Sequence, residues 1–339
     1  MNIEGIELDL QGLQILPGLI NAHDHLHFAL FPRLGSGPWP NATAWARDIY
    51  HPDDDPIRTH RQVPKHVRLI WGGLRNLLAG VTTVSHHDPL HEIFAEEFPV
   101  RVLTDFGYAH SLAFTKNIRE CFDATPPGAP FLIHLAEGTD ACAADEIFRL
   151  HELGALDSRT VLIHAVGLTA EGWHLVKQAG ASAIWCPRSN LFTLNRTLDP
   201  TLDIPLALGT DSPITAQGDL LDELRFVAET YSLPPSTLLD LVTTAPASIL
   251  RLPPRHDDWI AAPAFGQPPE LVVIGAKIKL ISHRLASALP EWLRRKFSPL
   301  ALEGRPEVLV RWNIPQLLRD TRQHLGSGPF RLAGRKVTA

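Results

Sequence analysis

A pair of histidines separated by one residue, His23-Asp24-His25, follows the apolar run Leu19–Ala22 and is the feature of this sequence with the clearest chemical meaning. Residues i and i+2 of a β-strand face the same side, so the two imidazoles are expected to point the same way. Two converging imidazoles suit a divalent transition metal such as zinc or iron. A His-x-His pair also occurs by chance on exposed strands. His27 continues the alternation, but the chain is expected to leave the strand there, so we assign it to the surroundings of the site or to the surface.

A second histidine, His134, ends the apolar run Phe131–Ile133, and Glu137 follows three residues later. Positions i and i+3 face opposite sides of a regular strand, but a turn at the strand end can bring both side chains into one pocket. A metal-bound histidine beside a free carboxylate is typical of hydrolytic metal sites, where one group holds the ion and the other moves protons. Alternatively, Glu137 interacts with the positive end of a helix that follows.

Two more apolar runs end in ionisable residues: His164 follows Val161–Ile163, and Asp211 follows Leu206–Thr210. His164 could instead be a buried histidine satisfied by backbone groups, and Asp211 could cap the next helix. A carboxylate after an apolar strand is costly unless it is paired or metal-bound. The inert interpretation requires the separate explanations to hold for every one of these residues at once. Taken together, the strand-end residues His23, His25, His134, His164 and Asp211 predict a metal site.

The elements that must position these residues are short apolar strands alternating with helices. The expected strands cover residues 14–25, 81–87, 100–108, 130–137, 160–164, 181–186 and 204–211. Helix-spaced apolar residues predict helices over residues 63–79, 139–153, 169–179, 220–231 and 235–250. This alternation predicts a parallel α/β fold. Ionisable residues at the carboxyl ends of the strands are typical of a (β/α)8 barrel of the TIM type. An open doubly wound sheet is the alternative, which the lack of a Gly-x-Gly-x-x-Gly turn disfavours.

The barrel prediction leaves one strand unplaced, because only seven strands are evident and the fourth is short or irregular. We expect the barrel over residues 15–252. Residues 1–14 with 253–339 are expected to form a small, abbreviated β-rich side domain, with a helix over residues 316–324 and a last strand over 331–338. The segment Leu34–Pro64 is a long insertion that is expected to form a lid or a pocket wall.

The amino-acid composition argues against several classes of protein. The chain has 339 residues, and 31 Lys and Arg against 37 Asp and Glu give a net charge of −6, which argues against a nucleic-acid partner. Three widely spaced cysteines cannot form a disulfide framework. No signal peptide and no membrane-spanning run are evident. We therefore expect a cytoplasmic protein with a small-molecule substrate and no membrane partner. No motif encodes the oligomeric state, and a homodimer is the commonest arrangement.

Several segments, in this order, resemble the amidohydrolase superfamily: PGLINAHDHLH, HLAEG, LIHAVGL, CPRSNLFTL and LGTDS. The resemblance spans about residues 14–250, includes GVTTV and TTAPASIL, and is strongest to the cytosine deaminase, guanine deaminase and triazine chlorohydrolase branch with one metal ion. Only 22 residues precede His23, whereas the family has a longer β-sandwich segment there.

The resemblance implies roles for individual residues. His23, His25, His134 and Asp211 would bind one divalent metal ion, with zinc favoured over iron. Glu137 would shuttle protons, and His164 would bind the hydroxide or the substrate, or lie close enough to be a ligand. Asn190 would shape the loop after the seventh strand, and Cys186 would be a packing residue. No lysine occupies the position of a carboxylated lysine that bridges two metals, unless Lys116 serves. One of His86 and His87 would contact substrate or have a structural role.

The predicted activity is metal-dependent hydrolysis of a C–N bond, by deamination or a related displacement on an amino-heterocycle or amide. The metal lowers the pKa of bound water and generates a hydroxide at neutral pH. Asp211 accepts the water proton, Glu137 protonates the leaving group, and His164 stabilises the developing charge. Two alternatives stay open: a lactonase or peptidase of the same superfamily, and a catalytically silent barrel that serves as a binding protein.

Overall fold

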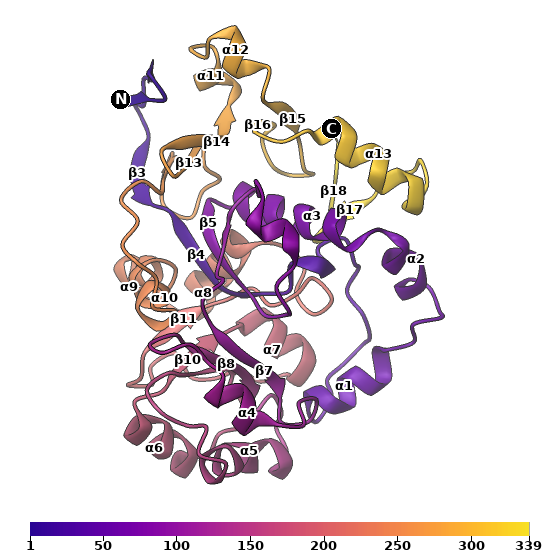
Figure 1. Ribbon diagram of the computed structural model, residues 1–339, viewed down its shortest axis with the longest axis vertical. Helices are drawn as coiled ribbons and strands as arrows, with labels where there is room; N and C mark the ends of the chain where they lie inside the picture. Colours follow the sequence, from indigo (N-terminus) through magenta and orange to yellow (C-terminus); the bar gives the residue numbers. More distant parts are fainter. Residues whose placement is uncertain (339) are drawn as a thin grey trace.

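The computed structural model describes residues 1–338, and its elements form two regions. Parallel strands surrounded by helices occupy the lower and middle part of Figure 1, while an antiparallel sheet with helices α11 to α13 lies at the upper end. The N-terminus also lies at this upper end (Figure 1). No helix among residues 1–338 has both the length and the apolar character needed to cross a bilayer.

The parallel strands form two sheets, one with three strands in the order β4-β5-β6 and one with five in the order β11-β10-β9-β8-β7. Every neighbouring pair in them is parallel. The strands are β4 (Leu19–Asp24), β5 (Val81–His86), β6 (Arg101–Val102), β7 (Gly107–Ser111), β8 (Phe131–Leu135), β9 (Thr160–His164), β10 (Ser182–Trp185) and β11 (Leu206–Leu208). The central strands are buried along their whole length, as apolar parallel strands covered on both faces are. The predicted α/β class with parallel sheets is confirmed.

The two parallel sheets are joined where β4 and β11 end. The backbone N–H groups of Thr210 and Asp211 donate to the carbonyl of His23 at 3.0 and 3.1 Å. Gly209 packs directly against β4, and a Cβ placed on it would lie 2.8 Å from the Cβ of His23. Only glycine permits this approach. The sequence Gly209-Thr210-Asp211 therefore fixes Asp211 beside the first histidine.

The prediction of one strand over residues 100–108 is wrong. The chain forms the two-residue strand β6, turns through the exposed residues Thr104 and Asp105, and then begins β7. β7 pairs with β8, with Gly107 opposite Phe131. The strand that sequence analysis could not place therefore begins inside the run assigned to its predecessor.

Helices connect the parallel strands on the outside. They are α3 (Lys65–Leu78), α4 (Ile118–Asp123), α5 (Ala141–Glu152), α6 (Ala170–Ala179), α7 (Pro187–Leu194), α8 (Leu220–Tyr231), α9 (Pro235–Asp240) and α10 (Thr244–Ile249). The predicted helices over 63–79, 139–153, 169–179 and 220–231 are confirmed within a few residues. The single helix predicted over 235–250 is wrong, because Thr243 has a non-helical backbone and separates α9 from α10.

The predicted insertion after the first strand contains two helices. The 3-10 turn η1 (Leu26–Phe28) follows β4 directly, and α1 (Ala42–Ile49) and α2 (Ile57–Gln62) lie before α3. A second 3-10 turn, η2 (Glu92–Ala95), follows β5. Asn41 caps α1 by accepting the backbone N–H of Ala44, which explains where this helix begins.

The antiparallel sheet has six strands in the order β15-β16-β14-β13-β12-β3. They are β3 (Gln14–Pro17), β12 (Trp259–Ala262), β13 (Leu271–Ile274), β14 (Lys277–Ser282), β15 (Ser298–Leu300) and β16 (Val308–Val310). Because β3 pairs with β12, the run over residues 14–25 is not one strand, and it divides at Gly18 between two sheets.

The remaining elements are short, except for the last helix. They are the hairpins β1 (Asn2–Ile3) with β2 (Ile6–Glu7) and β17 (Arg331–Leu332) with β18 (Arg335–Lys336), and the helices α11 (His283–Ala286), α12 (Glu291–Arg294) and α13 (Ile314–Leu325). The predicted helix over 316–324 is confirmed in α13, and the last predicted strand is a hairpin.

Candidate metal centre

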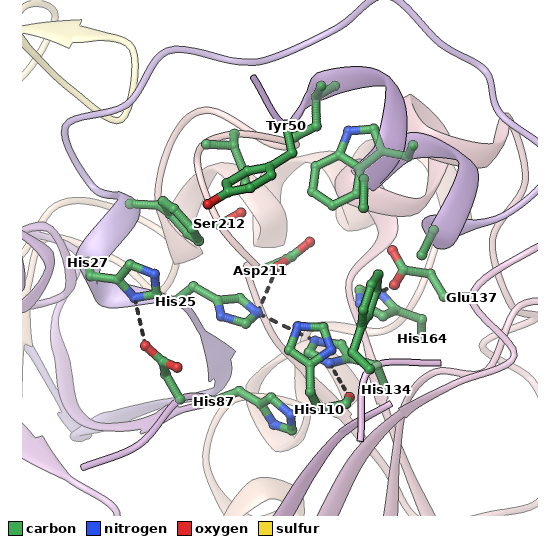
Figure 2. A pocket seen from close by; sticks show the side chains of 18 residues that line it. His25, His27, Tyr50, His87, His110, His134, Glu137, His164, Asp211 and Ser212 are labelled. Atoms are coloured by element: carbon green, nitrogen blue, oxygen red, sulfur yellow. Dashed lines mark hydrogen bonds and ion pairs between the residues drawn. The ribbon is translucent and has the colours of Figure 1, made fainter. Parts of the chain in front are cut away.

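Three imidazoles and one carboxylate converge where β4, β8 and β11 end. The Nε2 atom of His134 lies 3.3 Å from that of His23 and 3.4 Å from that of His25. Asp211 places Oδ1 3.6 Å from the Nε2 atoms of both His23 and His25. In Figure 2, His25 and His134 point toward each other, with Asp211 beside them. The four residues predicted as ligands from the sequence are thus brought together.

The spacing of these atoms fits a divalent metal ion. Four of the six separations among these atoms are 3.3–3.6 Å, which are separations that neighbouring ligand atoms can have around a zinc ion bound at about 2.0–2.2 Å. Three imidazole nitrogens with one carboxylate oxygen are also a donor set that zinc and iron accept. Zinc sites of this kind can expand to five-coordinate, which leaves room for a water or a substrate atom.

The protonation of the imidazoles suits metal binding. Nδ1 of His134 lies 2.7 Å from the carbonyl oxygen of His110, so Nδ1 carries the proton and Nε2 presents its lone pair to the centre. Burial lowers the pKa of His134 and of His25 well below the usual value, and neighbouring histidines lower both further. Both rings are therefore neutral at physiological pH.

Asp211 is held in its ionised form. Burial alone would raise its pKa, but the contact with His23 and the neighbouring histidines outweigh burial, and the net pKa lies below the usual value. Its other oxygen, Oδ2, accepts hydrogen bonds from Ser189 Oγ at 2.6 Å and Thr215 Oγ1 at 2.9 Å. These two hydroxyl groups orient the carboxylate so that Oδ1 faces the histidines.

Glu137 and His164 lie beside the ligands and contact each other. His164 Nε2 is 3.6 Å from Glu137 Oε2, and both side chains face the same cavity (Figure 2). Burial raises the pKa of Glu137 well above its usual value, and the nearby carboxylates of Asp211 and Glu146 add to the shift. Glu137 therefore retains a proton at a pH at which an exposed glutamate is ionised.

A chain of hydrogen bonds from strand β10 and helix α7 orients the His164 ring. Trp185 Nε1 donates to Thr197 Oγ1 at 2.7 Å, and Thr197 Oγ1 donates to Asn190 Oδ1 at 3.3 Å. This leaves the amide nitrogen of Asn190 to donate to His164 Nδ1 at 2.8 Å. Burial lowers the pKa of His164 to about 3, so its ring is neutral and its single proton lies on Nε2, which faces Glu137. In this tautomer His164 donates a hydrogen bond from Nε2, although its ring also lies close enough to His23 and His134 to form a possible ligand group with them.

Three site residues adopt left-handed backbone conformations that non-glycine residues rarely occupy. The φ angles are 51° at Ala136, 73° at His164 and 55° at Asp211. Each such residue costs about 1–3 kcal/mol unless the surroundings impose it, and such positions concentrate at functional sites. The turn at Ala136 lets His134 and Glu137 face one cavity despite the odd spacing between them.

Asp24, between the two histidines of β4, points away from the centre into a buried polar network. Its carboxylate accepts hydrogen bonds from Asn76 at 2.7 Å and Arg75 at 3.2 Å, both on helix α3. Asn21 links the network to β11, because its side chain exchanges hydrogen bonds with the backbone N–H and the hydroxyl group of Thr210. The network therefore anchors the strand ends that carry His23, His25 and Asp211.

Comparisons with known proteins agree with this geometry. No family model matches the chain. A 5-methylthioadenosine/S-adenosylhomocysteine deaminase from Pyrococcus furiosus is 26% identical over 271 residues, which are 64% of this chain and 63% of that protein. An aminodeoxyfutalosine deaminase from Deinococcus radiodurans is 36% identical over 89 residues, 24% of this chain and 21% of that protein. The chain spans less than two thirds of the length of the curated relatives it matches.

Solved structures resemble the chain over most of its length. An adenosine deaminase from Xanthomonas campestris with bound zinc has a TM-score of 0.64 at 17% identity, covering 93% of this chain and 85% of that one. An atrazine chlorohydrolase from Arthrobacter aurescens, in complex with zinc and atraton, has a TM-score of 0.66 at 17% identity, covering 93% and 89%. The chain is therefore similar in sequence to two deaminases and in fold to zinc-containing deaminase and triazine hydrolase structures. Its relatives lie among the deaminases and triazine hydrolases, as the sequence motifs indicated.

The candidate metal centre opens into a cavity of about 450 Å³. Polar groups gather at its inner end, among them His134, Glu137 and Asp211. The outer walls are apolar and consist largely of Phe28, Trp45, Ile49, Tyr50, Phe114 and Ile214. Because α1 contributes Trp45 and Ile49, the prediction that the insertion over residues 34–64 forms a pocket wall is confirmed.

The other candidates from the sequence have separate positions. His87 lines the cavity, whereas His86 accepts the backbone N–H of Leu26 at 3.2 Å and has a structural contact. Cys186 is buried and packs in the core. Lys116 is exposed and is not among the described residues that line the cavity.

Besides the two groups of possible ligands that include His23, a third group, His27, His86 and Asp88, suits a metal poorly. His86 accepts a hydrogen bond at Nδ1, so a neutral ring carries its proton on Nε2, the atom that would have to bind the metal. The ammonium group of Lys65 lies 3.2 Å from Asp88 and already balances this carboxylate.

Several residues that hold the site were not found by sequence analysis. Ser189 and Thr215 orient Asp211, and Arg75 and Asn76 hold Asp24. These contacts join residues far apart in the chain. The sequence carried one signal, because Asp24 alternates with the histidines on a buried strand and must find a partner on the opposite face.

Proposed function

We propose that the chain is an amidohydrolase, a metal-dependent hydrolase that acts on the C–N bond of an amino-heterocycle or amide. One observation carries the proposal: a ligand set with the spacing of a zinc site faces the same cavity as a buried glutamate whose pKa is raised. The printed names of the relatives, several of them deaminases, favour release of ammonia from a ring carbon. Zinc is favoured over iron because two of the similar structures contain it.

His23, His25, His134 and Asp211 would hold the ion, which supplies a hydroxide nucleophile at neutral pH by lowering the pKa of a water molecule. Asp211 accepts the proton of the attacking water, because its carboxylate is ionised and adjacent. Glu137 donates its proton to the departing nitrogen. His164 donates the Nε2 proton to the oxygen on which charge develops. Loss of one such group typically costs about 10²–10⁴ in rate.

We further infer that the eight parallel strands close into a (β/α)8 barrel over residues 15–252. The hydrogen bonds from Thr210 and Asp211 to His23 bring the last strand beside the first, and the site lies at the carboxyl ends of the strands, where barrel enzymes carry their chemistry. Residues 1–14 with 253–339 would form the side domain, to which β3 also contributes from just inside the barrel boundary.

The substrate we propose is a small molecule with a flat ring. A cavity with polar groups at the inner end and aromatic walls at the mouth suits a heterocycle whose reactive carbon meets the centre. The walls contributed by α1 would contact the substituents of the ring.

A screen of amino-heterocycles for ammonia release, on protein loaded with zinc, tests the proposal. Wild-type protein is expected to release ammonia from at least one member, and Glu137→Gln with a normal zinc content is expected to release none. Hydrolysis of lactones or peptides without ammonia release would contradict C–N deamination. A protein that binds no metal when zinc is supplied would contradict the hydrolase itself.

A further inference from the structure

A second hollow, here called the side chamber, adjoins the cavity of the metal centre. It has a volume of about 280 Å³ and lies between η1, helices α1 and α2, and the first turns of α3. The two hollows share His27, Phe28, Ile49, Tyr50 and Ile214 as walls. A group attached to a molecule at the metal centre can therefore extend into the side chamber.

The walls of the side chamber combine apolar and cationic side chains. The apolar residues are Phe28, Phe31, Leu34, Ile49, Ile57 and Ile214. The cationic residues are Arg61, Lys65 and Arg68, and no aspartate or glutamate is among the lining residues that the structure describes. The first turn of α3, which contains Lys65 and Arg68, adds the positive end of a helix dipole.

Arg68 is the most informative of these residues because it is a buried cation without a counter-ion. Its side chain donates to the backbone carbonyls of Val63, at 2.9 Å, and His27, at 3.0 Å. Within residues 1–338 no carboxylate lies within 4 Å of its guanidinium nitrogens. Burial of an unpaired charge is costly, so buried arginines are normally matched by an anion.

Arg61 extends this unbalanced charge, whereas Lys65 does not. Arg61 forms no ion pair within the described residues and donates only to the hydroxyl group of Tyr50, at 3.4 Å. Lys65 is balanced by Asp88, at 3.2 Å. Among the residues that the structure describes, neither Arg61 nor Arg68 of the side chamber therefore forms an ion pair.

A purely structural role for Arg68 explains only part of this arrangement. The hydrogen bonds to Val63 and His27 hold the turn after His25 against the start of α3, and a neutral donor would serve that purpose. They do not account for the second unpaired arginine facing the same hollow, nor for the continuity of that hollow with the metal centre.

We propose that the side chamber binds a carboxylate carried on an apolar or aromatic arm of the substrate. This inference rests on the proposed function for its second half, that the arm belongs to a molecule hydrolysed at the metal centre. Arg68 and Arg61 bind the carboxylate, and the phenylalanine and isoleucine walls contact the arm. Arginine suits this role because its planar guanidinium matches a carboxylate with two parallel hydrogen bonds.

A binding experiment tests the side chamber without depending on catalysis. Two fragments, benzoate and its uncharged analogue benzamide, are titrated into the zinc-loaded full-length protein, and ligand-observed NMR measures their binding. Benzoate is expected to bind and benzamide to bind at least tenfold more weakly. Arg61→Gln and Arg68→Lys should each weaken benzoate binding about tenfold, the first by removing a charge and the second by removing the planar fork. Arg58→Gln is the control, because Arg58 lies on the same helix, pairs with Asp55 and does not line the chamber.

Equal binding of the two fragments, no binding of benzoate, or unchanged affinity in both arginine variants would overturn the side chamber as a carboxylate site. Arg61 is exposed, so its variant is expected to fold normally even if Arg68→Lys does not.

The link to the substrate has its own test, in which amino-heterocycles are compared in pairs with and without a carboxylate-bearing side arm. The proposal expects kcat/KM at least tenfold higher for the carboxylate member, and Arg61→Gln should remove that preference. A preference for the neutral member would contradict a substrate carboxylate. If no pair is hydrolysed, the proposed function is wrong, and the benzoate titration alone decides the chamber.

Discussion

The molecule contains two clusters of buried ionisable side chains, and the two clusters differ in whether opposite charges within the chain balance each other. At the metal centre, electron-pair donors face one another: the Nε2 atoms of His23, His25 and His134 and the carboxylate of Asp211. At the start of α8, opposite charges face one another instead. Arg305 lies 2.7 Å from Asp219, and Arg335 lies 2.7 Å from Asp222.

The comparison indicates which cluster serves stability and which serves chemistry. The arginine–aspartate cluster joins the C-terminal segment to α8 and is complete within the chain. The candidate metal centre has no such internal counter-charges among the described residues, and its residues carry shifted pKa values and left-handed backbones. Substitutions at the centre should therefore abolish activity with little loss of fold, and substitutions in the arginine–aspartate cluster should do the reverse.

The largest effect is expected from His25→Ala. Loss of one of the three imidazoles should reduce bound metal from one ion per chain to a small fraction of that and abolish turnover, while the far-UV circular dichroism spectrum stays unchanged. Elemental analysis after dialysis measures the metal. A full equivalent of metal in this variant would refute His25 as a ligand. His51→Ala, at an exposed histidine in the loop between α1 and α2, is the matched control.

Glu137→Gln separates the chemistry from the metal. The amide keeps the shape of the side chain but cannot donate the proton that burial holds on Glu137, so kcat should fall by about 10²–10⁴ with normal metal content. Wild-type turnover on a true substrate would show that Glu137 is not the proton donor. Glu152→Gln, at an exposed residue of α5, should have no effect.

Arg305→Met is the corresponding test of the arginine–aspartate cluster. It leaves Asp219 buried with only its helix-cap hydrogen bonds, so the free energy of unfolding should fall by about 3–5 kcal/mol. Turnover per folded molecule should not change. Urea denaturation measures the first quantity and an active-site titration the second. Arg331→Met removes an exposed pair with Glu303 and should cost less than about 1 kcal/mol.

Asn190→Asp tests the orientation of His164 with a smaller effect. Aspartate can only accept at this position, so the His164 proton should move from Nε2 to Nδ1, and kcat should fall about 10–100-fold while metal content is retained. Nitrogen-15 NMR of the imidazoles reports the tautomer directly. An unchanged tautomer together with lost activity would show that Asn190 acts in another way.

The smallest effect concerns Glu223, a buried carboxyl on α8 near Arg188. Burial raises its pKa to about 8, although Arg188 opposes the shift. Because this value lies above the 4.5 of an unfolded glutamate, the folded chain binds more protons, and stability declines as the pH rises from 4.5 toward 8. Glu223→Gln should remove about 1.4 kcal/mol of this decline between pH 6 and pH 7. Parallel stability curves for both proteins would contradict the shifted pKa.

Much of the site could be predicted because its residues end apolar strands. His23, His25, His134, His164 and Asp211 each follow such a run, so a parallel arrangement of strands was enough to bring them to one edge. The same reasoning did not predict the bounds of the short strands β6 and β7. The break between β6 and β7 depends on two exposed residues, Thr104 and Asp105, inside an otherwise apolar run.

The contacts that tune the site could not be predicted because they cross the fold. Asn190 was expected to shape a loop, and its contact with His164 appears only when α7 is placed against β9. The sequence of α3, which is that of an ordinary amphipathic helix, likewise gives no sign that Arg68 is unpaired, since this depends on no carboxylate among residues 1–338 lying within 4 Å of it.

The most direct test is X-ray absorption spectroscopy at the metal edge of the purified, zinc-loaded protein. The account predicts one ion per chain with three imidazole nitrogens and oxygen ligands at about 2.0–2.2 Å, and a spectrum that does not change in His164→Ala. Four imidazoles, a sulfur ligand, or a spectrum that changes on loss of His164 would contradict the assignment of His23, His25, His134 and Asp211 as the ligands.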